Sequence, residues 1–131
     1  MKYLLDTSVL LHSLISRSRL NARALRLLSE DSPELYLSAV SPWEMAIKAA
    51  TGRLVLPERT SQVIERAMRL MSLKALDITP VHALAVEGLP SHHRDPFDRM
   101  LIAQASVERM ILLTADRIFE DYGIDIIFCG S

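Results

Sequence analysis

Short apolar segments alternate with helical segments along this chain. Five segments have the length and composition of buried strands: residues 2–5, 35–38, 74–78, 110–113 and 124–128. Between them, apolar residues recur at the spacing of amphipathic helices, in residues 7–15, 21–29, 41–50, 60–71, 79–87 and 96–106, with a helical turn at 117–122. This alternation predicts an α/β fold: a central parallel sheet with helices on both faces.

The chain has the length of one domain. Residues 1–131 contain no repeat, low-complexity tract or long linker, so we expect a single domain. No apolar run approaches the roughly 18 residues of a membrane helix, so no membrane association is expected. Cys129 is the only cysteine, which excludes an internal disulfide and favours a reducing, cytoplasmic setting.

The charge of the chain is almost balanced, at −1. This excludes a protein that coats a nucleic acid through overall attraction. If the chain acts on nucleic acid, it needs a local basic rim and metal ions.

Carboxylates stand at several predicted helix starts. In the clearest case, Asp95 has the position of an N-cap and Pro96 the first helical position, ahead of an apolar stripe. Four acids at or near such starts are candidate site residues: Asp6, Glu44, Asp98 and Asp116.

Helix capping can explain each of these acids singly. Ser41-x-x-Glu44 has the spacing of a capping box, and Asp95 fits an N-cap. Asp6 and Asp116 can cap the helical segments that follow them. On this interpretation the acids only stabilise helices.

The predicted sheet gives the acids a common place. Helices that follow parallel strands start at the carboxyl edge of the sheet, where ligands bind. Carboxylates gathered there repel one another unless protons or cations neutralise them, and oxygen ligands favour Mg²⁺ or Mn²⁺. Such ions activate water for attack on phosphodiesters, so the residues alone point to a metal-dependent phosphoryl hydrolase.

Polar side chains near the acids each allow two interpretations. Ser8 and Thr114 could orient a metal-bound water or only satisfy backbone groups. Lys48, four residues after Glu44, could pair with it or contact a phosphate. Three arginines are ordinary surface residues singly but together could hold the phosphates of a substrate strand: Arg94, Arg99 and Arg117.

Three ring side chains lie near the acids in the sequence. Trp43 is expected to pack in the core beside Glu44, with stacking on a base as the alternative. His92 and His93 precede Asp95 and could be metal ligands or RNA contacts. Without a second soft ligand nearby, neither role is favoured for them.

Four segments, in this order and at suitable spacing, resemble PIN-domain proteins: LLDTSVLL, SAVSPWEMAIKAATGRLVLP, ITPVHALAVEGLPSHHRDPFDRMLIAQA and LLTADRIFEDYGIDII. More closely, the chain resembles the VapC-like toxin ribonucleases of bacterial type II toxin–antitoxin pairs. The resemblance spans nearly the whole chain. It implies a flavodoxin-like sheet topology, which the pattern of strands and helices does not fix.

The resemblance also implies a function. Such proteins are Mg²⁺- or Mn²⁺-dependent endoribonucleases that hydrolyse RNA with metal-activated water, are inhibited by a cognate antitoxin and are usually homodimers. By this resemblance the catalytic and metal-binding residues are Asp6, Glu44, Asp98 and Asp116, and Asp95 remains a cap. Ser8 departs from close relatives, which often carry histidine there.

Three alternatives to a toxin ribonuclease stay open. The chain could be a PIN nuclease of RNA maturation or DNA flap processing, or a PIN interaction module without catalysis. It could also be an unrelated α/β domain whose acids are only caps. The sequence names neither the RNA nor the antitoxin.

Overall fold

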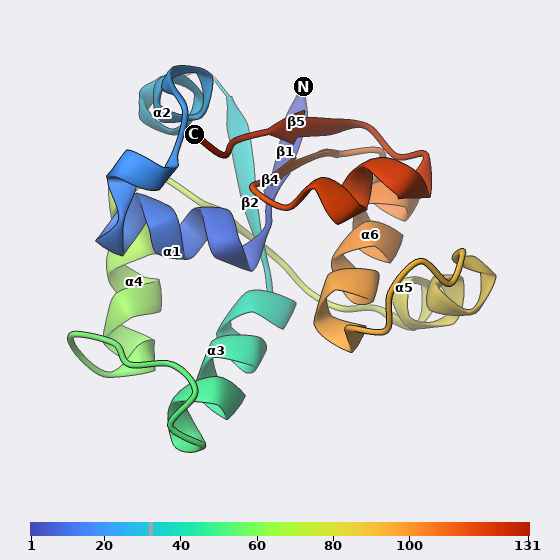
Figure 1. Ribbon diagram of the computed structural model, residues 1–131, viewed down its shortest axis with the longest axis horizontal. Coiled ribbons are helices and arrows are strands. Elements are labelled where there is room, and N and C mark those ends of the chain that lie inside the picture. The colour runs from blue at the N-terminus through green and yellow to red at the C-terminus, as the bar shows by residue number, and fades with distance from the viewer. Residues whose placement is uncertain (32) are drawn as a thin grey trace.

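The computed structural model describes residues 1–31 and 33–131, and Figure 1 shows how their elements are arranged. The strands are β1 (Lys2–Leu5), β2 (Glu34–Ser38), β3 (Lys74–Leu76), β4 (Ile111–Thr114) and β5 (Ile126–Phe128). The α-helices are α1 (Thr7–Ile15), α2 (Ala22–Ser29), α3 (Val40–Ala50), α4 (Thr60–Leu70), α5 (Pro80–Ala85) and α6 (Pro96–Glu108). Short 3₁₀ helices are η1 (Arg17–Arg19), η2 (Val86–Gly88) and η3 (Arg117–Tyr122).

The strands form one parallel sheet in the order β3-β2-β1-β4-β5. The chain starts at the centre, adds β2 and β3 outward, and crosses back to place β4 beside β1. The predicted α/β fold is therefore confirmed. The order differs in detail from the 2-1-3-4-5 order of flavodoxin itself, but the sheet has the same kind of switch point, here between β1 and β4.

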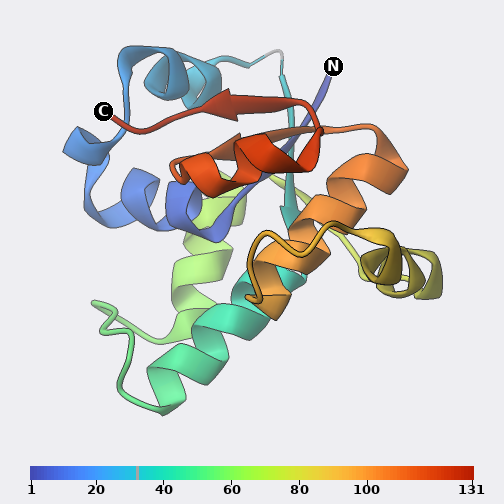
Figure 2. The same cartoon turned by 45° about the vertical axis from the view of Figure 1, so that its right-hand side comes forward.

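Helices cover both faces of the sheet, and each face has its own core. Helices α1, α2 and α4 pack on one face, and α6 and η3 pack on the other (Figure 2). Because side chains alternate along a strand, Leu5 lies in the first core and Leu4 in the second. Helix α3 belongs to both, since Met45 packs in the first core and Val40 in the second.

A buried polar network joins α5 and α6 to the end of β2. Ser38 Oγ donates to Gln104 Oε1 at 2.5 Å, and Gln104 Nε2 lies 3.3 Å from both the carbonyl of Asp77 and Nδ1 of His82. The other ring nitrogen of His82 lies 2.8 Å from Glu108 Oε2. Since every buried polar group here has a partner, the network fixes where α6 lies against the sheet.

Element bounds differ from the predictions in a few places. β3 ends at Leu76, because the next carbonyl bonds the Gln104 side chain instead of a strand. The predicted helix 79–87 divides into α5 and η2, and α6 extends to Glu108. Residues 53–60, which the sequence predicts to be a connection, form no strand. A turn expected at residues 31–33 includes Ser32, which lies outside the described residues.

Among the helices of residues 1–31 and 33–131, none combines the length and the apolar character needed to cross a membrane.

Candidate metal centre

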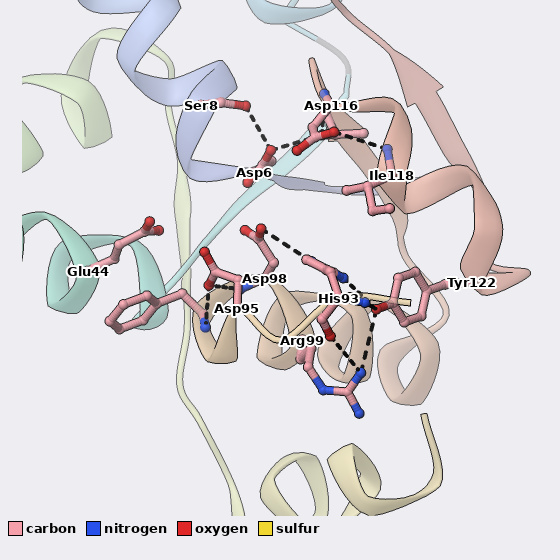
Figure 3. Close-up of polar contacts among 12 residues, drawn as sticks. Asp6, Ser8, Glu44, His93, Asp95, Asp98, Arg99, Asp116, Ile118 and Tyr122 are labelled. Carbon is pink, nitrogen blue, oxygen red and sulfur yellow. Dashed lines mark hydrogen bonds and ion pairs between the residues drawn. The ribbon is translucent and has the colours of Figure 1, made fainter. Parts of the chain in front are cut away.

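A cleft of about 230 Å³ opens at the carboxyl edge of the sheet. Thr7, Ser8, Leu11 and Lys48 form part of its wall. The four candidate acids from the sequence all line it, as does the helix-capping acid, so the structure brings together five carboxylates from distant parts of the chain (Figure 3): Asp6, Glu44, Asp95, Asp98 and Asp116.

Asp6 lies deepest among these acids, at the end of β1, and is 3% exposed. Its side chain does not cap α1, so the capping interpretation is wrong for this residue. Instead, Oδ2 accepts hydrogen bonds from Ser8 Oγ at 2.7 Å and Thr114 Oγ1 at 2.8 Å. Burial raises the pKa of Asp6; the two hydroxyls act in the opposite direction, and the charge of Glu44 raises it further.

Asp98 lies in the first turn of α6, and Asp95 caps that helix. As predicted, Asp95 Oδ1 accepts from the backbone N–H groups of Phe97 at 2.9 Å and Asp98 at 3.1 Å. The Asp98 carboxylate is left to face the cleft. Burial first, and then the charges of Asp6 and the other three cleft acids, raise the pKa of Asp98 to about 8.

Glu44 enters the cleft from α3, and the predicted capping box around it is absent. The helix starts at Val40, one residue earlier than expected, so Ser41 lies inside the helix and its hydroxyl bonds Thr7 Oγ1 at 2.9 Å. Glu44 Oε2 pairs with Lys48 Nζ at 2.5 Å, which confirms the intrahelical ion pair. Glu44 Oε1 is buried and accepts no hydrogen bond from the described residues.

Asp116 lies at the end of β4 and both caps and lines the site. Its Oδ1 accepts from the N–H of Ile118 at 3.0 Å, so it caps η3 as the alternative interpretation expected. Its own N–H donates to Thr114 Oγ1 at 3.0 Å, the hydroxyl that also donates to Asp6. Asp116 and Asp6 are thereby tied to the same threonine at the centre of the sheet.

This donor set fits a divalent cation such as Mg²⁺ or Mn²⁺. All its ligands are oxygens, and one buried glutamate oxygen lacks a partner among the described residues. Burial first, and then the neighbouring negative charges, raise the pKa of Asp98 to about 8. In the described residues as they stand, no three His, Cys, Asp or Glu side chains converge closely enough to enclose an ion. Binding would therefore draw the carboxylates inward.

Two residues lie differently from what the sequence suggested, and one interaction was missed. His93 Nε2 lies 3.4 Å from Asp98 Oδ2, while its Nδ1 lies 2.5 Å from Tyr122 Oη (Figure 3). No periodic pattern relates residue 93 to 98, so only the loop geometry shows this contact.

Arg99 and Arg94 do not line the cleft. The Arg99 guanidinium instead donates to carbonyls of residues 86–93, including Pro90 O at 2.7 Å.

Trp43 was expected in the core, and this expectation is wrong. The side chain is 52% exposed and meets the ring of Phe97 edge to face, with centroids 4.9 Å apart. Glu44, one position along α3, is the residue that turns inward. Two aromatic rings therefore lie beside the cleft, each next to one of its acids.

The chain is similar to one known family and to several solved structures. Residues 3–125 match the PIN domain. No curated protein matches the chain in sequence.

Three solved structures illustrate the similarity. The structure of VapBC2 from Rickettsia felis, bound to a DNA fragment from the VapBC2 promoter, has a TM-score of 0.76 and 14% sequence identity. The match covers 98% of this chain and 99% of that chain. FitAcB from Neisseria gonorrhoeae has a TM-score of 0.67 and 22% sequence identity, and the match covers 95% of this chain and 96% of that chain. DNA-bound VapBC from Salmonella typhimurium has a TM-score of 0.67 and 17% sequence identity, and the match covers 98% of each chain. The structural likeness shows the fold, and the match over residues 3–125 shows that this chain belongs to the PIN-domain family.

Proposed function

We propose that the chain is a metal-dependent endoribonuclease of the VapC type, the toxin of a type II toxin–antitoxin pair. The observation that carries the proposal is the cleft in which five carboxylates from four parts of the chain face one another. Asp95 and Asp116 also cap helices, but the mutual repulsion of five carboxylates in one cleft is relieved when a cation neutralises them. The PIN family and the VapBC-like neighbours support nuclease chemistry at this place.

Asp6, Glu44, Asp98 and Asp116 would hold Mg²⁺ or Mn²⁺, directly or through water. When bound, such an ion supplies Lewis-acid polarisation of a phosphate oxygen and activation of water for in-line attack. The protein's part is to orient the donors. The hydroxyls of Ser8 and Thr114 fix the rotation of Asp6, and the capped start of α6 fixes Asp98.

Lys48 has two possible contributions in this arrangement. It pairs with one oxygen of Glu44 and leaves the other without a partner. The pair raises the pKa of Lys48, so the ammonium stays charged throughout the physiological range. The lysine therefore holds the Glu44 carboxylate in place and keeps a positive charge at the wall of an otherwise acidic cleft.

The same comparison supports a protein partner. Among the solved structures similar to this chain is a toxin–antitoxin complex from Klebsiella pneumoniae, with 17% identity and a TM-score of 0.64. We propose a cognate antitoxin as the protein partner. From the resemblance to VapC-like ribonucleases we also propose RNA as the substrate, a homodimer as the assembly and the cytoplasm as the location.

The test is cleavage of single-stranded RNA by the purified chain with Mg²⁺, Mn²⁺ or excess chelator. We expect cleavage only with metal. Asp6→Asn and Asp98→Asn should each lower the rate by about 10²-fold or more, since even residues that only support metal ligands matter by 10–100-fold. Glu65→Gln, an exposed acid on α4, is the matched control and should cleave as the unaltered chain does.

Other outcomes would select among the alternatives. Cleavage of DNA flaps but not of RNA would favour a DNA-processing nuclease. No cleavage of either, with full binding of metal, would favour an interaction module. Full activity of Asp98→Asn would contradict the assignment of the site.

A further inference from the structure

Among the described residues that line the acidic cleft, Lys48 is the one basic side chain, and it is paired with Glu44. An RNA strand must nevertheless be attracted to a protein of net charge −1. Positive charge is concentrated in the segment after α1. From Thr7 to Ser29 the sequence has no Asp or Glu, and it carries four arginines: Arg17, Arg19, Arg23 and Arg26.

The first three of these arginines are exposed and unpaired by acids. Arg17 and Arg19 belong to η1, and Arg23 lies in the first turn of α2. No ion pair among the described residues includes any of the three. No acid of the described residues competes with an anionic partner for these guanidinium groups, although Arg17 Nη1 donates to Ser13 O at 3.4 Å.

The segment that carries them is fixed to the end of β5. Asn21 Nδ2 donates to the carbonyls of Phe128 at 2.9 Å and Gly130 at 3.2 Å, and its backbone N–H donates to Cys129 O at 2.8 Å. From the other side, the N–H of Ser131 donates to Arg19 O at 3.0 Å. Figures 1 and 2 both show the C-terminus beside the segment that links α1 and α2.

The same strand end reaches the acidic cleft. The N–H of Cys129 donates to Thr114 O at 2.7 Å, and the hydroxyl of Thr114 donates to Asp6. The carbonyl of the same residue, Cys129, accepts from the N–H of Asn21 in the basic segment at 2.8 Å. The end of β5 is thus the physical link between the basic segment and the acidic cleft.

Arg117 extends the basic surface toward the cleft, which it does not itself line. It follows Asp116 directly, and its guanidinium lies 3.8 Å from the ring centroid of Phe128. Its partner Glu120 is at 2.9 Å, but both side chains are largely exposed, so a phosphate can compete for the arginine. Arg17, Arg19, Arg23 and Arg117 are named here the arginine strip.

We propose that the arginine strip binds the phosphates of single-stranded RNA as the strand leaves the acidic cleft over the end of β5. The inference rests on the proposed function and assigns the path of its substrate. Arginine suits this role because its planar fork donates two hydrogen bonds to phosphate oxygens. The strip replaces Arg94 and Arg99, which the sequence suggested but the structure places elsewhere.

The experiment measures binding of a fluorescent oligouridylate to Asp98→Asn in excess chelator, where cleavage cannot interfere, at several NaCl concentrations. Each phosphate contact contributes about 0.7 to the slope of log K against log salt for single strands. The strip variant carries Arg19→Gln and Arg23→Gln in addition to Asp98→Asn. We expect these two substitutions to lower the magnitude of that slope by roughly 1.4. The control pair is Arg53→Gln and Arg109→Gln, two exposed arginines outside the strip, and should leave the slope unchanged. Arg109 lies near the start of β5, not near the end that carries the strip.

The outcomes separate this inference from the proposed function. An unchanged slope in the strip variant, or no binding of oligouridylate at low salt, would overturn the strip. If the strip variant loses instead the binding of polyglutamate, the strip would serve an acidic protein. The strip variant could show the lower slope although the unaltered chain cleaves no RNA. That result would contradict the proposed nuclease activity and would keep the strip as an RNA-binding surface.

Discussion

At the scale of single residues, Asp98 gives the cleft its clearest pH dependence. The unfolded chain releases the Asp98 proton near the ordinary pKa of 3.8, whereas the folded, metal-free chain keeps it up to about pH 8. Between these values the folded state holds more protons, so the free energy of unfolding should fall as pH rises. We expect a loss on the order of 3 kcal/mol between pH 4 and 8, since one pKa unit is about 1.4 kcal/mol and neighbouring acids share the titration.

Urea unfolding of the metal-free protein at pH 5, 6, 7 and 8 measures this loss. Asp98→Asn should be more stable than the unaltered chain at pH 8 and should show a flatter dependence, because it has no charge to bury. A stability that rises from pH 5 to 8 in the unaltered chain would contradict the burial of an ionised Asp98.

The acids of the cleft could be predicted from the sequence because each follows a recognisable strand or helix start. The roles of individual groups could not. Whether Ser41 caps a helix or bonds Thr7 depends on a shift of one residue in the start of α3. The exposure of Trp43 could not be predicted, because apolar residues within a single helical turn do not show which of them faces the core and which faces solvent.

At the scale of elements, the start of α6 serves two purposes that can be separated. Asp95→Ala should destabilise the protein by about 1 kcal/mol, because two backbone N–H groups lose their acceptor. Asp95→Asn keeps a good cap and removes one negative charge from the cleft, so it should match or exceed the stability of the unaltered chain.

Thermal or urea unfolding of the two variants at neutral pH compares these effects. Equal destabilisation by both substitutions would show that the charge of Asp95, and not its hydrogen bonds, stabilises α6. The two variants also test whether Asp95 caps the helix while Asp98 faces the cleft, which the helix-start pattern alone does not decide.

At the scale of the whole molecule, metal binding should raise the stability of the fold. At a hundredfold excess over its dissociation constant, Mn²⁺ adds about 2.7 kcal/mol by mass action, which is roughly 10 °C in Tm for a chain of this size. Asp98→Asn should lose most of this shift, and Glu65→Gln should keep it. Equal shifts in all three proteins would place the ion outside the cleft.

The parallel sheet with two covered faces followed from the alternation of strands and helices, but the strand order did not. Periodicity shows that β4 is buried; it does not show that β4 returns to the side of β1. That choice depends on long-range contacts of α6, including the Gln104 network that binds it to the end of β2. Such contacts join residues far apart in the sequence, and no local pattern encodes them.

The exposed Trp43 is the only tryptophan of the chain. All tryptophan emission therefore originates beside Glu44, from an indole in contact with a ring of α6. An ion that draws α3 and α6 together would alter the polarity around that indole, and so the colour and intensity of its fluorescence. The protein thus has a built-in optical reporter at its cleft, and occupancy can be followed in real time without a label or a known substrate.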